Sequence, residues 1–144
     1  MKRVVITGMG INSCIGNTLE AVQNSLENGI SGTRHNSTYE ELNFKSHVSA
    51  AAEQNFDGID RKLKRFMGVC AMYAYNSALA AVEHAGLTAE QIGGNPRYGI
   101  AGGSGGGSTA SVIEMNELLN TKGARKVGPF FVPRNMSNTI TANV

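Results

Sequence analysis

Residues 98–108 read YGIAGGSGGGS, and this stretch decides the fold class of the chain. Its first four residues, Tyr98 to Ala101, predict a short buried strand. Five glycines then occupy the six positions from Gly102 to Gly107, which favours a loop where a ligand or substrate chain passes close to the backbone over a plain turn. The apolar spacing that follows predicts a helix over 109–120. A strand, a glycine loop and a helix in succession are typical of the α/β class.

The same order of elements occurs near the start of the chain. Val4 to Thr7 form a β-branched run that ends at a glycine, which predicts a second buried strand. Asn17-Thr18 begins a predicted helix through Asn28, and the only strand-like piece after it is His47 to Ala51. The longest predicted element is one continuous helix from Arg61 to Ala85, with the carboxylate of Asp60 as its N-cap.

Length and composition exclude several classes of protein. The chain has 144 residues, 41% apolar and 17% charged, so we expect one domain over residues 1–144 and no disordered tail. A net charge of +2 is too small for a general nucleic-acid binder. No apolar run approaches the ~18 residues of a membrane span. With no signal sequence, the two cysteines are expected as reduced thiols in a cytoplasmic protein.

The stretch Gly8-Met9-Gly10 allows two interpretations. A strand followed by Gly-x-Gly begins the dinucleotide-binding fingerprint, which would place a nicotinamide or flavin cofactor here. That fingerprint needs a third glycine where this chain has Ser13. The favoured interpretation is a structural turn in which the two glycines let chain segments cross closely, and no cofactor is expected.

A cluster of cations lies at the start of the predicted long helix. Its members are Arg61, Lys62, Lys64 and Arg65. Because a helix N-terminus is positive, each exposed cation there is disfavoured by about 0.3–1 kcal/mol. The cluster is therefore either a solvated face or a docking surface for an acidic partner. A second, smaller basic group contains Lys122, Arg125 and Lys126.

Residues that could carry catalysis do not combine into a site. His35, His47 and His84 stand in three unrelated sequence contexts, and no spacing of His, Cys and Asp suggests a metal site. On the predicted helix, Cys70 occupies the apolar face, as expected of an inert core thiol. The apolar segment around Phe130-Phe131 and Met136 is expected either in the core or in an oligomer interface.

Taken together, these stretches resemble the N-terminal part of a β-ketoacyl-[acyl-carrier-protein] synthase, closest to type I. The matching pieces run in the family's order: 4–11, 28–32, 59–62, 65–67, 95–97, 103–108 and 127–133. The resemblance implies the N-terminal part of a thiolase-like fold, a layered α/β architecture that is incomplete in this chain. It also implies a homodimer, acyl carrier protein as partner, and fatty-acid elongation by decarboxylative Claisen condensation.

The resemblance also implies roles for particular residues. Gly105 and Gly106 fall where the acyl pocket begins, and Phe131 and Met136 match positions that reach across the dimer to line the partner's pocket. The expected carrier-protein surface contains Arg61, Lys62, Arg65 and Lys126, with Arg125 as a rival for the last position.

The family's catalytic residues are not expected in this chain. The nucleophilic cysteine and both catalytic histidines of the family fall beyond Val144, so we expect less than half of an enzyme, inactive alone. Two alternatives stay open at this stage: a dinucleotide-binding oxidoreductase domain, or a non-catalytic chain that only dimerises or binds carrier protein.

Overall fold

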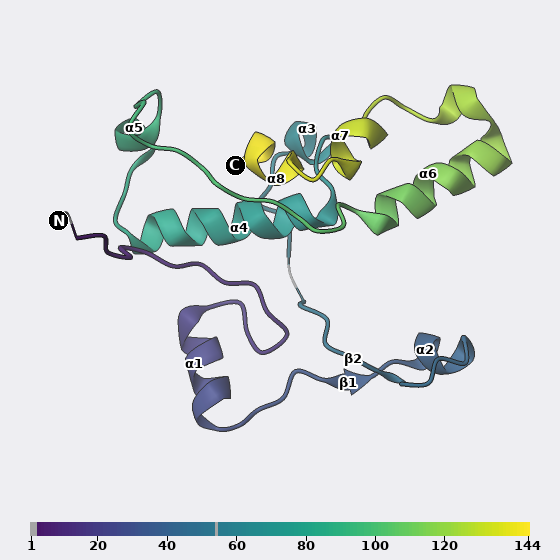
Figure 1. The fold of residues 1–144 in the computed structure, drawn as a ribbon, viewed down its shortest axis with the longest axis horizontal. Coiled ribbons are helices and arrows are strands. Elements are labelled where there is room, and N and C mark those ends of the chain that lie inside the picture. Colours follow the sequence, from purple (N-terminus) through teal and green to yellow (C-terminus); the bar gives the residue numbers. More distant parts are fainter. Residues whose placement is uncertain (1–2, 54) are drawn as a thin grey trace.

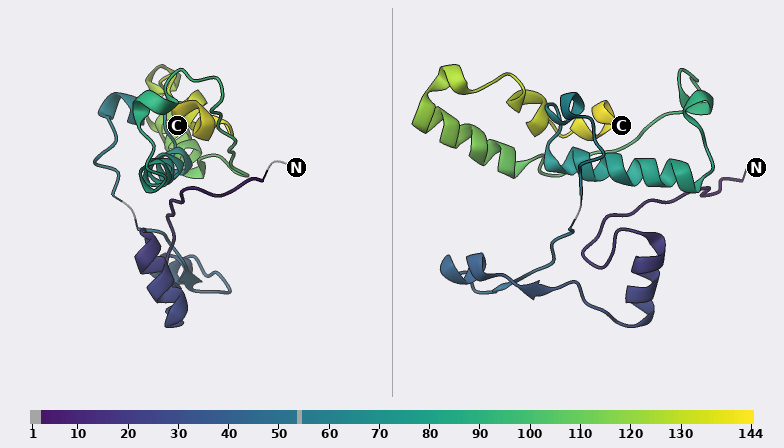
Figure 2. Two further views of the ribbon diagram at one scale, coloured as in Figure 1. Left: turned by 90° about the vertical axis from the view of Figure 1, so that its left-hand side faces the viewer. Right: turned by 180° about the vertical axis from the view of Figure 1, so that it is seen from behind.

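The computed structural model describes residues 3–53 and 55–144. In chain order the elements are α1 (Leu19–Glu27), β1 (Arg34–His35), α2 (Ser37–Glu41), β2 (Val48–Ser49), α3 (Arg61–Lys64), α4 (Val69–His84), α5 (Ala89–Ile92), α6 (Thr109–Lys122), the 3-10 turn η1 (Ala124–Lys126), α7 (Phe131–Asn135) and α8 (Thr139–Asn143). Helices α4 and α6 form a long bar, and the short helices α3, α7 and α8 gather beside its middle (Figure 1). The first helix and the two short strands lie to one side of this bar (Figure 2). Over the described residues, every helix is too short or too polar to cross a bilayer.

Three helices begin at the capping residues that their local sequences provide. The Thr18 side chain accepts a hydrogen bond from Ala21 N at 3.1 Å, at the start of α1. Asp60 Oδ1 accepts from Lys62 N at 2.7 Å and from Leu63 N at 3.3 Å, which confirms the predicted N-cap. Helix α6 has Ser108 as its cap, with the predicted start at residue 109. A capping side chain binds a backbone N–H two or three residues further along the chain. The start of such a helix can therefore be predicted from the local sequence alone.

The prediction of one continuous helix over 61–85 is wrong, because the chain bends between α3 and α4. The bend brings Gly68 against other segments: a Cβ at this position would lie 2.6 Å from both Arg134 O and Ser108 Cβ. Close approach of these segments therefore requires the glycine. The break also weakens the argument from the helix dipole. The cations of 61–65 belong to a single short turn, and Arg65 lies at its C-terminal end, where positive charge is favoured.

The two predicted buried strands at 4–7 and 98–101 are absent. Both segments are irregular, and their apolar side chains face solvent, with exposures of 95% for Val4, 83% for Ile6 and 55% for Ile100. A strand is stabilised by hydrogen bonds to a neighbouring strand, and no strand lies beside either segment within the described ranges. The strand-like piece at 47–51 does form β2, which pairs antiparallel with β1 in a two-stranded sheet.

The buried core is small and lies where α3 meets α4. It consists of Ile59, Met67 and Ala71, each at most 3% exposed. Partly buried residues that pack on it are Phe56, Leu63, Met72 and Tyr75. This core fixes α3 to the first half of α4, and so holds the cations of α3 in a defined place.

The segment from Gly8 to Asn12 runs along α4 and settles the interpretation of its glycines. Gly8 lies so close to the helix that a Cβ would be 2.7 Å from Ala85 N, and Met9 N donates to His84 Nδ1 at 3.0 Å. Further along, Asn12 Nδ2 donates to a backbone carbonyl of α4, that of Tyr73, at 2.8 Å. The backbone of α4 thus lies against both glycines, which favours a structural crossing over a dinucleotide site. The glycines form the expected structural crossing.

Candidate functional site

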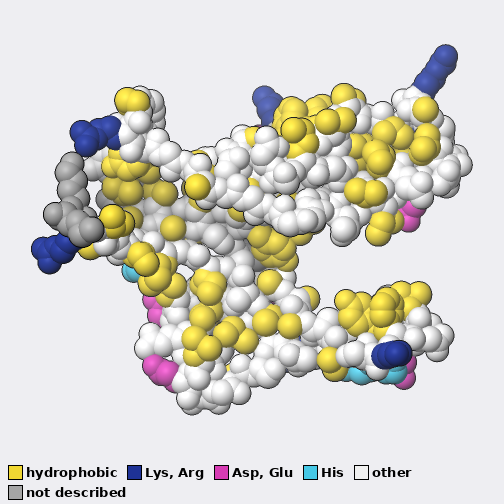
Figure 3. Space-filling view, viewed as in Figure 1, with side chains coloured by type: hydrophobic (Ala, Val, Ile, Leu, Met, Phe, Trp, Pro, Cys, Tyr) yellow, Lys and Arg dark blue, Asp and Glu magenta, His cyan; other side chains and the backbone are white. Residues whose placement is uncertain are grey.

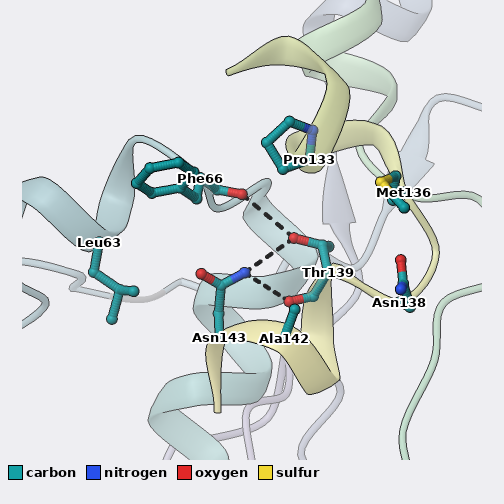
Figure 4. A pocket seen from close by; sticks show the side chains of 8 residues that line it. All are labelled: Leu63, Phe66, Pro133, Met136, Asn138, Thr139, Ala142 and Asn143. Atoms are coloured by element: carbon teal, nitrogen blue, oxygen red, sulfur yellow. Dashed lines mark hydrogen bonds between the residues drawn. The ribbon is translucent and has the colours of Figure 1, made fainter. Parts of the chain in front are cut away.

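A pocket of about 330 Å³ lies between α3 and the C-terminal helices, near the lower end of the range of about 300–1,000 Å³ typical of ligand sites. It is lined by Leu63, Phe66, Pro133, Met136, Asn138, Thr139, Ala142 and Asn143. Apolar side chains from α3 and from the α7 segment face each other across it (Figure 4). Such a lining suits an apolar chain better than a charged group.

A hydrogen bond ties one wall of the pocket to the other. Thr139, which is 2% exposed, donates through Oγ1 to Phe66 O at 3.4 Å. Asn143 Nδ2 donates to Thr139 O at 2.7 Å and to Thr139 Oγ1 at 3.1 Å (Figure 4). Because Phe66 follows the α3 turn, the Thr139–Phe66 bond joins α8 to the α3 side, whereas the two Asn143 bonds lie within α8.

Phe131 and Met136 lie at opposite ends of the segment that forms α7. Phe131 is 7% exposed, and the Arg134 guanidinium carbon lies 5.3 Å from the centre of its ring. Phe130 packs edge-on against Phe66, with 5.1 Å between ring centres. Met136 is 47% exposed and lines the pocket. The aromatic pair is thus packed within the chain, whereas Met136 remains accessible.

The glycine loop approaches the same segment from the other side. A Cβ at Gly107 would lie 2.7 Å from Asn135 O, so the loop touches the residue before Met136. At Gly105 and Gly106, by contrast, an added Cβ would have no neighbour within 4 Å. The loop is therefore anchored at its end and open at its middle, next to the α7 segment.

Arg61, Lys62 and Arg65 are exposed together on and beside α3. None of these three cations forms an ion pair with any carboxylate of residues 3–53 or 55–144. The nearest acid in sequence, Asp60, is engaged as the helix cap. Arg134 Nε donates to Arg65 O at 3.0 Å, which joins this turn to α7. The result is an unneutralised positive surface beside an apolar pocket.

Lys126 lies apart from the other three cations. Both Lys126 and its rival Arg125 are exposed in η1, which follows the far end of α6 (Figure 1). The 14 residues of α6 rise about 21 Å, and its first turn lies near Gly68. The structure therefore brings Arg61, Lys62 and Arg65 together and leaves Lys126 at a distance.

Comparison with known families matches residues 1–144 to the description "Beta-ketoacyl synthase, N-terminal domain". The chain belongs to the β-ketoacyl synthase family. It is 40% identical over 144 residues to a 3-oxoacyl-[acyl-carrier-protein] synthase 1 of Haemophilus influenzae, covering 99% of this chain and 35% of that protein. The chain thus spans about a third of the length of this curated relative.

Solved structures show the fold. A β-ketoacyl synthase from Burkholderia phymatum superposes with a TM-score of 0.80 at 29% identity, over 100% of this chain and 36% of that one. A ketosynthase solved in complex with its type II PKS acyl-carrier protein superposes with a TM-score of 0.69 at 19% identity. The match covers 96% of this chain and 37% of that one. The fold is the N-terminal part of the thiolase-like α/β fold, as the sequence predicted.

The cysteines of this β-ketoacyl synthase chain lack a catalytic setting. Both Cys14 and Cys70 are free thiols. Because the predicted helix is broken, Cys70 lies in the first turn of α4 rather than in its middle. His84, on the same helix, is 14 residues further along and hence about 21 Å away. His84, the one histidine on α4, is therefore too far away to activate the Cys70 thiol.

Two residue groups escaped the sequence analysis. His35 and His47, predicted to be unrelated, lie with ring centres 6.4 Å apart, and Glu40 joins them. Only the pairing of β1 with β2 brings these residues together, and no local sequence pattern predicts that pairing.

Elsewhere, in α5, hydrogen bonds from the backbone N–H of Glu90 and from the Thr88 side chain lower the pKa of the Glu90 carboxyl.

Proposed function

We propose that this chain provides the carrier-docking surface and part of the acyl pocket of a 3-oxoacyl-[acyl-carrier-protein] synthase that elongates fatty-acyl chains. The observation that carries the proposal is the arrangement around α3. Three exposed cations without partners, Arg61, Lys62 and Arg65, lie on the turn whose Leu63 and Phe66 line the apolar pocket. A single turn of helix can thus meet an acidic protein on one side and an acyl chain on the other.

The proposed partner is an acyl carrier protein with an acidic surface. The related ketosynthase solved with its acyl-carrier protein supports this choice. Opposite charges on two partners speed their encounter and fix their orientation more than they add affinity. Lys126, with Arg125 as its rival, would make a separate basic contact at the far end of α6.

The proposed reaction is a decarboxylative Claisen condensation. An acyl group is held as a cysteine thioester, and malonyl-carrier protein loses CO2 to give a carbanion. The carbanion attacks the thioester carbonyl, a carbon–carbon bond forms, and the thiolate leaves. We propose that neither Cys14 nor Cys70 is that nucleophile, since neither matches the position of the family's nucleophilic cysteine.

The same proposal assigns the pocket residues. Gly105 and Gly106 leave open space where an acyl chain would begin, and Met136 is accessible enough to line a pocket in a homodimer. The resemblance predicts that Phe131 reaches the partner's pocket as well, but it is 7% exposed and packed within this chain, so we assign that role to Met136 alone. Two free thiols fit a reducing compartment, and we propose a cytoplasmic location.

Charge reversal tests the docking surface in the intact synthase. Replacing Lys62 and Arg65 by glutamate should raise KM for carrier-linked substrates by about tenfold or more at low salt. The effect should shrink as salt screens the attraction in the parent enzyme. A small thioester without the protein carrier should react as before. Lys45→Glu is the charge-matched control for Lys62→Glu alone, because each changes the net charge by the same amount and Lys45 is exposed but lies between α2 and β2.

Two outcomes would overturn the assignment. If carrier-linked and small substrates lose activity equally, α3 has a structural role only. If Lys45→Glu raises KM as much as Lys62→Glu does, the effect reflects net charge rather than a docking surface.

A further inference from the structure

The turn between the two strands carries a group of metal-ligating side chains outside the site described above. Strands β1 and β2 pair with His35 opposite Val48, and Asn36 N donates to His47 O at 2.7 Å, which extends the pairing by one step. The two histidines are thereby held on neighbouring strands, and their rings meet edge to face at 87°. Histidine side chains and an acidic group gather at this edge (Figure 3).

Helix α2 adds the third ligand. Asn36 caps this helix, its side chain accepting from Tyr39 N at 3.3 Å, so the chain turns back directly after β1. That turn brings Glu40 Oε2 to 3.2 Å from His35 Nε2. One ligand atom from each of His35, Glu40 and His47 lies within 4.8 Å of the others.

We propose that His35, Glu40 and His47 bind a divalent transition-metal cation of the zinc class. Two imidazole nitrogens and one carboxylate oxygen form a donor set that zinc accepts in proteins. A tetrahedral zinc ion with bonds of about 2.0–2.2 Å holds its ligand atoms roughly 3.4 Å apart. The His35–Glu40 separation of 3.2 Å already matches. His35 and Glu40 are exposed and His47 is partly exposed, so side-chain rotation would close the remaining distance to His47. Solvent supplies the fourth ligand.

The cation would act as a staple for this part of the chain. The sheet has two residues in each strand, and neither β1 nor α2 contains a buried residue. An isolated two-stranded hairpin is marginally stable in water. A cation bound by β1, α2 and the residue before β2 would join all three elements and stabilise the folded state by mass action.

Calorimetric titration of the intact protein with ZnCl₂ tests the site, with MgCl₂ as the control cation. The parent should show a zinc-binding event that MgCl₂ does not reproduce, because Mg²⁺ prefers oxygen ligands. Loss of an indirect partner of a metal ligand weakens binding by about 10–100-fold, so His35→Gln, Glu40→Gln and His47→Gln should each weaken this event at least tenfold. His84→Gln, which removes a histidine outside the group, should leave it unchanged.

Cobalt absorption gives a second readout that does not depend on heat or on activity. Co²⁺ should produce visible bands in the parent and in His84→Gln, and should lose them in Glu40→Gln, whose isosteric side chain preserves the fold. Equal zinc binding by the parent and by His35→Gln or His47→Gln would overturn the proposal, as would unchanged cobalt bands in Glu40→Gln. Neither result bears on carrier docking, which uses other residues.

Discussion

The crossing of the N-terminal segment over α4 predicts a large effect from one added methyl group. In Gly10→Ala the new Cβ would lie 2.9 Å from Ala81 N and closer still to Ser77 O. Both are backbone atoms of a 16-residue helix and cannot rotate away. The N-terminal segment must therefore lift from α4, which breaks the bonds that Met9 and Asn12 form with the helix.

The magnitude follows from three contributions. Overpacking costs about 1–3 kcal/mol, and each lost hydrogen bond costs about 0.5–1.5 kcal/mol. Replacing glycine stiffens the unfolded chain, which offsets about 0.4–1 kcal/mol. We expect the free energy of unfolding of Gly10→Ala to fall by about 3 kcal/mol, a large share of the roughly 5–15 kcal/mol that stabilises a typical domain.

Urea unfolding followed by circular dichroism measures this loss as a lower transition midpoint with an unchanged slope. Gly99→Ala is the matched control, because a Cβ there would meet no atom within 4 Å. It should leave stability unchanged or raise it by up to about 1 kcal/mol. If both variants unfold at the same urea concentration, the crossing does not require glycine and the reasoning fails. Tight binding of NADH or NADPH that Gly10→Ala abolishes would instead favour the dinucleotide interpretation.

Three further predictions concern the proposed function and the exposed surface. In the intact synthase, Gly106→Ile should fold normally, since a Cβ there has open space. It should lower kcat/KM for long acyl substrates relative to short ones. If the ratio of kcat/KM for long and short substrates equals that of the parent, the pocket assignment is refuted. Radiolabelled acyl donor should leave no stable thioester on Cys14 or Cys70 of the 144-residue chain, and mass spectrometry of labelled peptides would reveal one. The same chain should self-associate in sedimentation experiments, because it exposes large apolar side chains; Val4, Ile6, Leu26 and Val132 are 67–95% exposed. A monodisperse monomer that melts cooperatively would contradict this prediction.

The elements that sequence predicted correctly are those set by near neighbours. Thr18, Asp60 and Ser108 cap their helices by accepting hydrogen bonds from N–H groups at most three residues away. The local sequence therefore predicts where each helix begins. The segments at 4–7 and 98–101 have the composition of strands, but a strand needs a partner that composition does not supply.

The errors share a cause in contacts between distant residues. The break at Gly68 depends on Arg134, 66 positions away in the chain, and no local pattern in 61–85 encodes it. The meeting of His35 with His47 likewise requires two strands to pair first. For the candidate site, the cations of α3 were found from their charge, but their position beside the pocket depends on α8 folding back onto Phe66.

The contact between Met9 and His84 has a consequence for how the chain is made. These residues are 75 positions apart, and a ribosome adds about 5–20 residues per second, so roughly 4–15 s pass before the partner helix of the first segment exists. Throughout that interval Gly8 and Gly10 have no helix backbone to pack against, and the Met9 N–H has no His84 ring nitrogen to bind. The crossing is therefore a late contact in synthesis, since residues 8–12 can dock only after α4 has been made and has formed its helix.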